Sequence, residues 1–142
     1  MSYRVKDYMD REFPTIETAS SAVEAAKAMA KAVKSYLIVL DKGSPKGMLT
    51  EDDLVRKVLA AEMDPKKLKV SDVMSSPLIT VDPDEDLIKA SEIMQKNGIK
   101  RLPVVKEGII YGVLTSQNIA QKCGAYVEKS VKDILRWSFP MG

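Results

Sequence analysis

The 142-residue sequence predicts an α+β fold built from two copies of one unit, and three observations lead to this prediction. Sliding the chain by 65 residues aligns two segments without a gap, with 15 identities over 58 aligned positions. Each copy contains short apolar runs that are separated by polar, glycine-containing turns, as in hairpins. Each copy also has one helical stretch before these runs and one after them. The chain is therefore predicted to be two β-α-β-β-α repeats, related by a pseudo-twofold axis.

The first copy begins with a short strand and a capped helix. Ser21 and Glu24 have the Ser-x-x-Glu spacing of a capping box, which predicts the beginning of an alanine-rich helix. A polar turn with Gly43 separates two strands, and a second helix follows Thr50. The expected elements are a strand at residues 15–16, a helix at 22–33, strands at 36–40 and 47–50, and a helix at 51–62.

The second copy repeats this order. The segment Asp82-Pro83-Asp84 predicts a helix beginning, and Gly98 predicts its end. The expected elements are a strand at residues 78–81, a helix at 85–97, strands at 102–105 and 109–115, and a helix at 116–127.

The domain organisation follows from the repeat. We expect repeat 1 at residues 1–63, a linker at 64–69, repeat 2 at 70–127 and a C-terminal tail at 128–142. A unit of about 60 residues is only marginally stable alone, so the repeats should share a core and leave a cleft between equivalent strands. The first helix should contribute an apolar stripe to that core, made of Val23, Ala26, Met29, Ala30 and Val33.

Composition excludes several classes of function. The chain has no histidine and one cysteine, Cys123, which argues against Ser-His-Asp catalysis, histidine-ligated zinc, thiolate clusters and an internal disulfide. No apolar run is long enough to cross a bilayer, and no signal peptide begins the chain, so we expect a cytoplasmic protein without membrane contact. A net charge of +2 does not by itself indicate nucleic-acid binding.

Several motifs carry a resemblance to a known family. These are GMLTEDDL at residues 47–54, its counterpart GVLTSQNI at 112–119, the V-x-D-x-M openings at 5–9 and 70–74, and IKRLPVV at 99–105. With them, the chain resembles a pair of cystathionine-β-synthase-type (CBS) domains, known as a Bateman module. The resemblance implies a stand-alone regulatory module that binds AMP, ADP, ATP or S-adenosylmethionine without a required cofactor or metal. It also implies no catalysis, a homodimer through the helical faces, and a separate, unidentified regulated protein.

The resemblance also implies two clefts, each with a ribose-binding corner from one repeat and adenine- or phosphate-binding residues from the other. Asn118 stands where the family more often has aspartate, and Tyr36 occupies the place in repeat 1 that Arg101 occupies in repeat 2. We therefore expect tighter ribose binding at the Asp53 corner and stronger phosphate dependence at the Asn118 corner. One cleft is expected to contain Thr50, Asp53, Thr80, Ile99, Lys100 and Pro103, with Tyr36 at its phosphate-facing place and Lys100 as its main cation. The other is expected to contain Thr115, Asn118, Thr15, Ser35 and Ile38, with Arg101 near the phosphates.

Simpler interpretations remain open at this level. Thr50 and Asp53 also fit a plain helix cap, and Lys100 and Arg101 also fit a solvated strand end. Trp137 in the tail would contact a partner or fold back over the module. A nucleic-acid-associated CBS module is the alternative function, suggested by Lys66, Lys67, Lys69 and Lys96.

Overall fold

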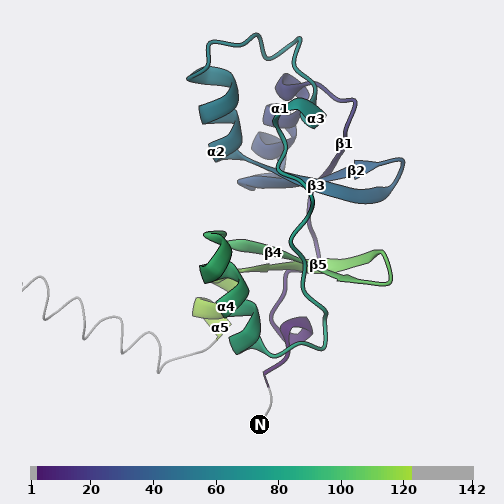
Figure 1. The fold of residues 1–142 in the computed structure, drawn as a ribbon, viewed down its shortest axis with the longest axis vertical. Helices are drawn as coiled ribbons and strands as arrows, with labels where there is room; N and C mark the ends of the chain where they lie inside the picture. The colour runs from purple at the N-terminus through teal and green to yellow at the C-terminus, as the bar shows by residue number, and fades with distance from the viewer. Residues whose placement is uncertain (1–2, 123–142) are drawn as a thin grey trace, which may run out of the picture.

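The predicted α+β fold of two repeats is confirmed by the computed structural model, which describes residues 3–122. Figure 1 shows two halves stacked along the long axis, with their sheets facing each other at the centre and the helices on the outer sides. A small apolar cluster around Tyr36, Ile38 and Val113 fills the space between the sheets. The expected tail and the end of the last helix, residues 123–142, lie outside the described residues.

The first half holds a three-stranded sheet. Its order is β1 (Thr15–Glu17), β2 (Tyr36–Asp41) and β3 (Ser44–Thr50), with β1 parallel and β3 antiparallel to β2. After β3 the chain forms α2 (Glu51–Leu54) and the π-helical turn η2 (Val55–Leu59). The second helix of this half therefore ends at Leu59, before the expected residue 62, because the backbone turns at Glu62 with a φ of 56°.

Helix α1 (Ala22–Ala32) begins as predicted, because the Ser21 hydroxyl accepts a hydrogen bond from the Glu24 backbone N–H at 3.1 Å. Its predicted core stripe is wrong: the buried residues are Ala22, Ala25 and Met29. This face packs in one cluster with Leu37, Val39 and Leu49 of the sheet. Of the expected stripe only Met29 is buried, while Val23 is half-buried and Ala26, Ala30 and Val33 are exposed.

The second half holds α4 (Leu87–Asn97), β4 (Arg101–Lys106), β5 (Ile109–Thr115) and α5 (Ser116–Lys122). Helix α4 begins two residues later than expected, because Asp86 is its N-cap, and it ends at Gly98 as predicted.

The predicted strand at residues 78–81 is absent, since only Val81 forms a bridge, with Val104. In the first half, the Ile38 N–H donates to the Pro14 carbonyl at 2.9 Å and extends the parallel pairing. The equivalent residue in β4 is Pro103, which has no N–H to donate. The second sheet therefore has two strands where the first has three.

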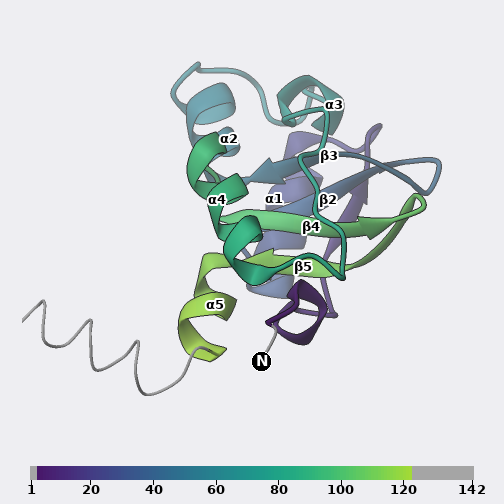
Figure 2. The same ribbon diagram turned by 60° about the horizontal axis from the view of Figure 1, so that its bottom comes forward.

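The V-x-D-x-M openings cross to the opposite half. The opening of repeat 1 forms the short helix η1 (Val5–Asp7), and Val5 lies in the core of the second half with its N–H bonded to the Glu85 carbonyl at 3.0 Å. The opening of repeat 2 forms α3 (Val70–Val73), which packs in the core of the first half. Figure 2 shows α3 beside the first-half elements. The boundaries at residues 63 and 70 therefore describe the repeat in the sequence. In the folded structure, the opening of each repeat packs in the core of the other half.

Two glycines make room for the crossing segments. A Cβ added at Gly47 would lie 2.6 Å from the Ser75 carbonyl oxygen, and one added at Gly112 would lie 2.4 Å from the Asp10 carbonyl oxygen. At these places Ser75 bridges Met48 and Asp10 bridges Val113. The absence of a side chain at both glycines therefore allows each crossing segment to pair with the opposite sheet.

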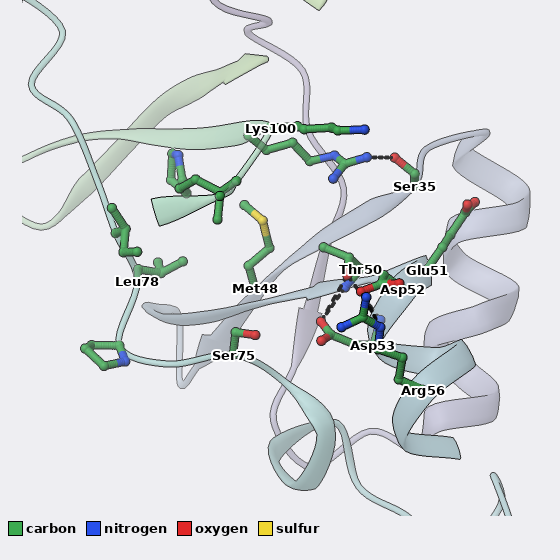
Figure 3. A pocket seen from close by; sticks show the side chains of 16 residues that line it. Ser35, Met48, Thr50, Glu51, Asp52, Asp53, Arg56, Ser75, Leu78 and Lys100 are labelled. Atoms are coloured by element: carbon green, nitrogen blue, oxygen red, sulfur yellow. Dashed lines mark hydrogen bonds and ion pairs between the residues drawn. The ribbon is translucent and has the colours of Figure 1, made fainter. Parts of the chain in front are cut away.

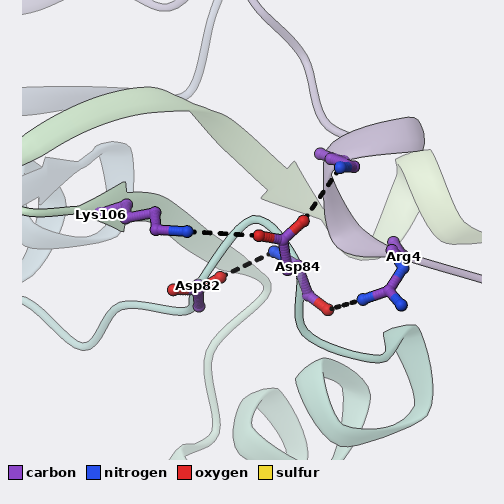
Figure 4. Close-up of polar contacts among 5 residues, drawn as sticks. Arg4, Asp82, Asp84 and Lys106 are labelled. Atoms are coloured by element: carbon purple, nitrogen blue, oxygen red, sulfur yellow. Dashed lines mark hydrogen bonds and ion pairs between the residues drawn. The ribbon is translucent and has the colours of Figure 1, made fainter.

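Charged contacts hold the N-terminal segment against the second half (Figure 4). The Asp84 carboxylate contacts Lys6 Nζ at 2.9 Å and Lys106 Nζ at 3.4 Å, and the Arg4 guanidinium donates to the Asp84 carbonyl at 2.7 Å. Hydrogen bonds from Lys6 and Lys106 lower the pKa of Asp84, and the same carboxylate raises the pKa of Lys106. The equivalent residue in repeat 1 is Ala19, so this cluster has no counterpart at the matching position.

Within residues 3–122, no helix combines the length and apolar character that a membrane span requires.

Candidate functional site

Two cavities lie between the halves, with volumes of about 610 and 450 Å³. Both fall in the range of small-molecule sites. We call them cavity 1, built on the Thr50 corner, and cavity 2, built on the Thr115 corner. Both contain Ser35, Lys100 and Arg101, so these three residues form a shared wall.

The corner of cavity 1 is a complete capping box. The Thr50 N–H donates to Asp53 Oδ2 at 2.9 Å, and the Asp53 N–H donates to Thr50 Oγ1 at 3.2 Å. The Thr50 hydroxyl also donates to Oδ2 at 3.1 Å, while Oδ1 pairs with Lys57 Nζ at 3.2 Å. The helix-cap interpretation is thus correct in geometry. The same cap fixes the Asp53 carboxylate at the cavity wall, where it could also accept ligand hydroxyls.

Figure 3 shows Thr50 and Asp53 on one side of cavity 1, with Leu78 and Lys100 across from them. The structure brings together five of the seven residues predicted for this cleft. Thr80 is exposed and does not line the cavity, and Tyr36 lines cavity 2 instead. Sequence reasoning missed lining residues of three kinds. Some lie on the crossing segment (Ser75, Pro77, Leu78 and Ile79), some on the helical turns after the corner (Glu51, Asp52 and Arg56), and two elsewhere, Met48 on β3 and Gly98 at the end of α4.

The corner of cavity 2 repeats the cap with an amide. The Thr115 N–H donates to Asn118 Oδ1 at 2.9 Å, and the Asn118 N–H donates to Thr115 Oγ1 at 2.9 Å. The Asn118 side-chain NH₂ then donates to Asp10 Oδ1 at 3.0 Å. Asn118 is 5% exposed, so a ligand has little access to the acceptor and donor that these contacts leave unused.

Cavity 2 gathers four of the residues predicted for it, Ser35, Arg101, Thr115 and Asn118, and it also contains Tyr36, which the prediction placed in the other cleft. Two predicted residues lie elsewhere: Thr15 is exposed on β1, and Ile38 is fully buried between the sheets. Sequence reasoning missed Asp10, Val33, Lys34, Ser116, Gln117 and Gln121, and it gave Lys100 to cavity 1 alone. The 65-residue repeat aligns Asp10 with Ser75, so the sequence does show that repeat 1 has an extra carboxylate at this position.

Arg101 contacts two other residues of the cavity walls, Ser35 and Tyr36. Its guanidinium donates a hydrogen bond to Ser35 Oγ and lies 5.7 Å from the centre of the Tyr36 ring, within cation–π range. Arg101 is half-buried, and the solvated-strand-end interpretation is wrong for it. Lys100 is exposed and lines both cavities.

The Tyr36 hydroxyl is buried and has no hydrogen-bond partner among residues 3–122. Burial, and then the charge of Asp10, raise the pKa of Tyr36 to about 12, while Arg101 acts in the opposite direction. This hydroxyl therefore stays neutral at physiological pH.

The two cavities differ in charge. Cavity 1 is lined by Glu51, Asp52 and Asp53 against Arg56 and the two shared cations. Cavity 2 is lined by Asp10 against Lys34 and the same two cations, so its local potential is more positive. Among residues 3–122, no group of three His, Cys, Asp or Glu side chains converges as metal ligands.

Comparison with known proteins agrees with this architecture. The chain is 37% identical over 122 residues to an uncharacterized protein of Methanopyrus kandleri, covering 84% of this chain and 62% of that protein. It is 32% identical over 116 residues to the CBS domain-containing protein YhcV of Bacillus subtilis, covering 82% of each. The chain thus spans less than two thirds of the first of these relatives.

A solved hexameric CBS-CP12 protein from bloom-forming cyanobacteria has a similar fold. Its TM-score is 0.80 at 27% identity, covering 86% of this chain and 68% of that one. The family model described as "CBS domain" matches twice, at residues 5–60 and 70–124. The chain therefore belongs to the CBS domain family and carries a tandem CBS pair.

Proposed function

We propose that this CBS pair is a regulatory module that binds adenosine-bearing ligands in cavities 1 and 2 and signals to a partner protein. One observation carries the proposal. Each cavity joins a Thr-x-x-Asp or Thr-x-x-Asn corner from one repeat to side chains of the other repeat, with Lys100 and Arg101 between them. Such a site offers acceptors for a ribose and cations for phosphates.

Cavity 1 has separate regions for the parts of a nucleotide. Asp53 supplies a carboxylate for the ribose hydroxyls, and Lys100 supplies a charge for phosphate. Met48, Ile99 and Pro103 give the apolar surface that an adenine ring requires. Because three carboxylates balance the cations here, cavity 1 also suits the cationic S-adenosylmethionine.

Cavity 2 suits phosphorylated ligands better. Lys34, Lys100 and Arg101 face a single carboxylate there. Hydrogen bonds between charged groups are about twice as strong as neutral ones, so added phosphates should raise affinity most in this cavity.

Signalling would follow from the position of the ligand between the halves. A ligand that contacts both repeats stabilises one relative placement of them and selects it from the ensemble. The exposed outer helices would then present that placement to a partner.

Calorimetry and thermal unfolding with AMP, ADP, ATP and S-adenosylmethionine test the proposal. At a ligand concentration of 100 times Kd, mass action should stabilise the fold by about 2.7 kcal/mol. Guanosine monophosphate is the control for base selectivity. If none of the four adenosine compounds raises the unfolding temperature or gives a binding signal in calorimetry, the proposed ligand class is wrong.

We propose further that binding involves no turnover. The Thr50 hydroxyl and the Asp53 carboxylate of cavity 1 are engaged with each other in a helix cap, and the Asn118 amide at the corner of cavity 2 cannot act as a base. Purified protein should leave ATP intact over hours. Hydrolysis that survives purification and is lost in Asp53→Ala would contradict this.

We also propose a homodimer through the outer helical faces. Two apolar α1 positions that do not enter the core, Ala26 and Ala30, are exposed, and Leu59 and Ile88 are 71% and 70% exposed. Light scattering at high micromolar concentration should give the mass of two chains. The Ala30→Glu variant should have a lower mass by light scattering than the wild type, whereas Lys31→Glu on the same helix should change the mass less. A single-chain mass in the wild type would contradict the dimer.

Nucleic-acid binding remains the alternative prediction. Lys66, Lys67 and Lys69 are exposed in the linker, whereas Lys96 lies on α4 of the other half. Oligonucleotide affinity that falls steeply with salt would favour it.

A further inference from the structure

Cavity 2 contains a carboxylate that does not belong to its corner. Asp10 follows the opening of repeat 1, crosses to the second half and lines this cavity beside Asn118. Its backbone is held by two hydrogen bonds with Val113, each 2.9 Å long, at the place where Gly112 lets the segment approach. The carboxylate is therefore attached to a fixed point of the sheet rather than to a free loop.

The amide of Asn118 is poorly suited to accept ribose hydroxyls. Its Oδ1 already accepts from the Thr115 N–H, and its NH₂ donates to Asp10. Asp10 has more free acceptor positions. Among residues 3–122, its Oδ1 accepts from Asn118 only, and its Oδ2 lies 3.9 Å from Lys34 Nζ, beyond hydrogen-bond distance. The Asp10 side chain is 37% exposed, so a ligand can reach its remaining lone pairs.

The equivalent positions of cavity 1 show the reverse arrangement. There the corner residue is Asp53, and the crossing segment supplies Ser75, which makes the same backbone bridge, to Met48. At these two positions, each cavity therefore has one carboxylate. Cavity 1 pairs a corner Asp with a crossing Ser, and cavity 2 pairs a corner Asn with a crossing Asp.

We propose that Asp10 is the residue that binds the ribose hydroxyls in cavity 2, and that Asn118 acts as a positioning residue for its carboxylate. This rests on the proposed function of the cavity. The acid that the corner of repeat 2 lacks is supplied by the opening of repeat 1, so a complete cavity 2 requires both repeats.

The test is calorimetry on the full chain with AMP and 2′-deoxy-AMP, with the amide NMR signals of Thr115 and Asn118 reporting cavity 2. Asp10→Ser copies the crossing residue of cavity 1 and should weaken AMP binding at cavity 2 about tenfold. It should also remove the preference for AMP over 2′-deoxy-AMP there. Asp7→Asn is the matched control, because this exposed acid of the same segment lines neither cavity and should change nothing.

The double variant Asp10→Ser with Asn118→Asp recreates the residue pair of cavity 1 inside cavity 2. It should restore AMP affinity to within about threefold of the wild type, a rescue that a purely structural role of Asp10 would not give. If Asp10→Ser keeps wild-type AMP affinity and 2′-hydroxyl preference at cavity 2, or if the double variant folds without rescue, Asp10 does not hold the ribose. If the wild type binds no AMP in either cavity, the proposed function itself fails.

Discussion

Cavities 1 and 2 are built on the same backbone corner, yet their side chains have diverged. In both, a Thr N–H donates to the side chain three residues on, at 2.9 Å, because that helix terminus needs an acceptor whatever else changes. Only cavity 1 has the carboxylate at this position, while cavity 2 has an amide and receives Asp10 from the crossing segment. The comparison shows that local geometry requires the cap at both corners. The carboxylate that faces the ligand can instead be supplied by either of two neighbouring positions, the corner or the crossing segment.

The largest effects are expected where the crossing segments pass the sheets. Gly47→Ala and Gly112→Ala place a Cβ within 2.6 and 2.4 Å of a carbonyl oxygen, and backbone cannot yield as a side chain does. Each should lower the free energy of unfolding by about 3 kcal/mol, measured in urea.

Gly43→Ala is the control for these variants. A Cβ added there meets no atom of the described residues within 4 Å beyond its chain neighbours, although the φ of 81° makes the substitution cost about 1 kcal/mol. Equal losses at all three glycines would contradict the importance of the close approach. Gly112→Ala should also weaken cavity 2 selectively, because it displaces Asp10.

The next effect concerns the corner of cavity 1. Asp53→Ala removes a charge-assisted acceptor worth about 1.5–3 kcal/mol, so ligand affinity at cavity 1 should fall roughly tenfold to a hundredfold in calorimetry. The variant also loses its cap, at about 1 kcal/mol of stability. Unchanged affinity in Asp53→Ala together with abolished binding in Asn118→Ala would show that cavity 2, not cavity 1, holds the ribose more tightly.

Arg101→Ala should separate the cavities by their dependence on phosphate. Because cavity 2 has a more positive lining, its affinity for AMP should fall about tenfold, while that for adenosine should change little. Arg56→Ala, which alters cavity 1 alone, is the matched control. Equal losses for adenosine and AMP would mean that Arg101 acts by holding Ser35 and Tyr36 rather than by binding phosphate.

Tyr36→Phe gives the smallest effect and distinguishes a packing role from a polar one. At neutral pH the variant should be as stable as the wild type or up to about 1 kcal/mol more stable, since the lost hydroxyl is buried without a partner among the described residues.

Alkaline pH sharpens this prediction. The pKa of Tyr36 is raised from 10.0 to about 12, so the unfolded chain ionises first and the wild type loses stability between these values. At pH 11 the wild type should have lost about 1 kcal/mol relative to Tyr36→Phe. Parallel stability curves for the two proteins from pH 9 to 12 would contradict the raised pKa.

Local signals in the sequence determined much of this protein. The 65-residue repeat, the hairpins and the caps at Ser21, Thr50 and Thr115 all depend on contacts between residues close in the chain. A capping hydrogen bond spans three residues, so its spacing can be found in any single sequence. The same holds for Gly98, whose positive φ ends α4 as predicted.

The tertiary structure decided which residues meet. The sequence aligns Val5 with Val70 but does not say that each packs in the opposite half, and this exchange alone brings Asp10 to Asn118. Likewise, the apolar sequence at residues 78–81 predicts a strand. In the structure it would pair with β4, where Pro103 has no N–H to donate the needed hydrogen bond. Helix α1 buries Ala22, Ala25 and Met29 because that face meets Leu37, Val39 and Leu49 of the sheet, and the apolar spacing along an alanine-rich helix does not select one face over its neighbour.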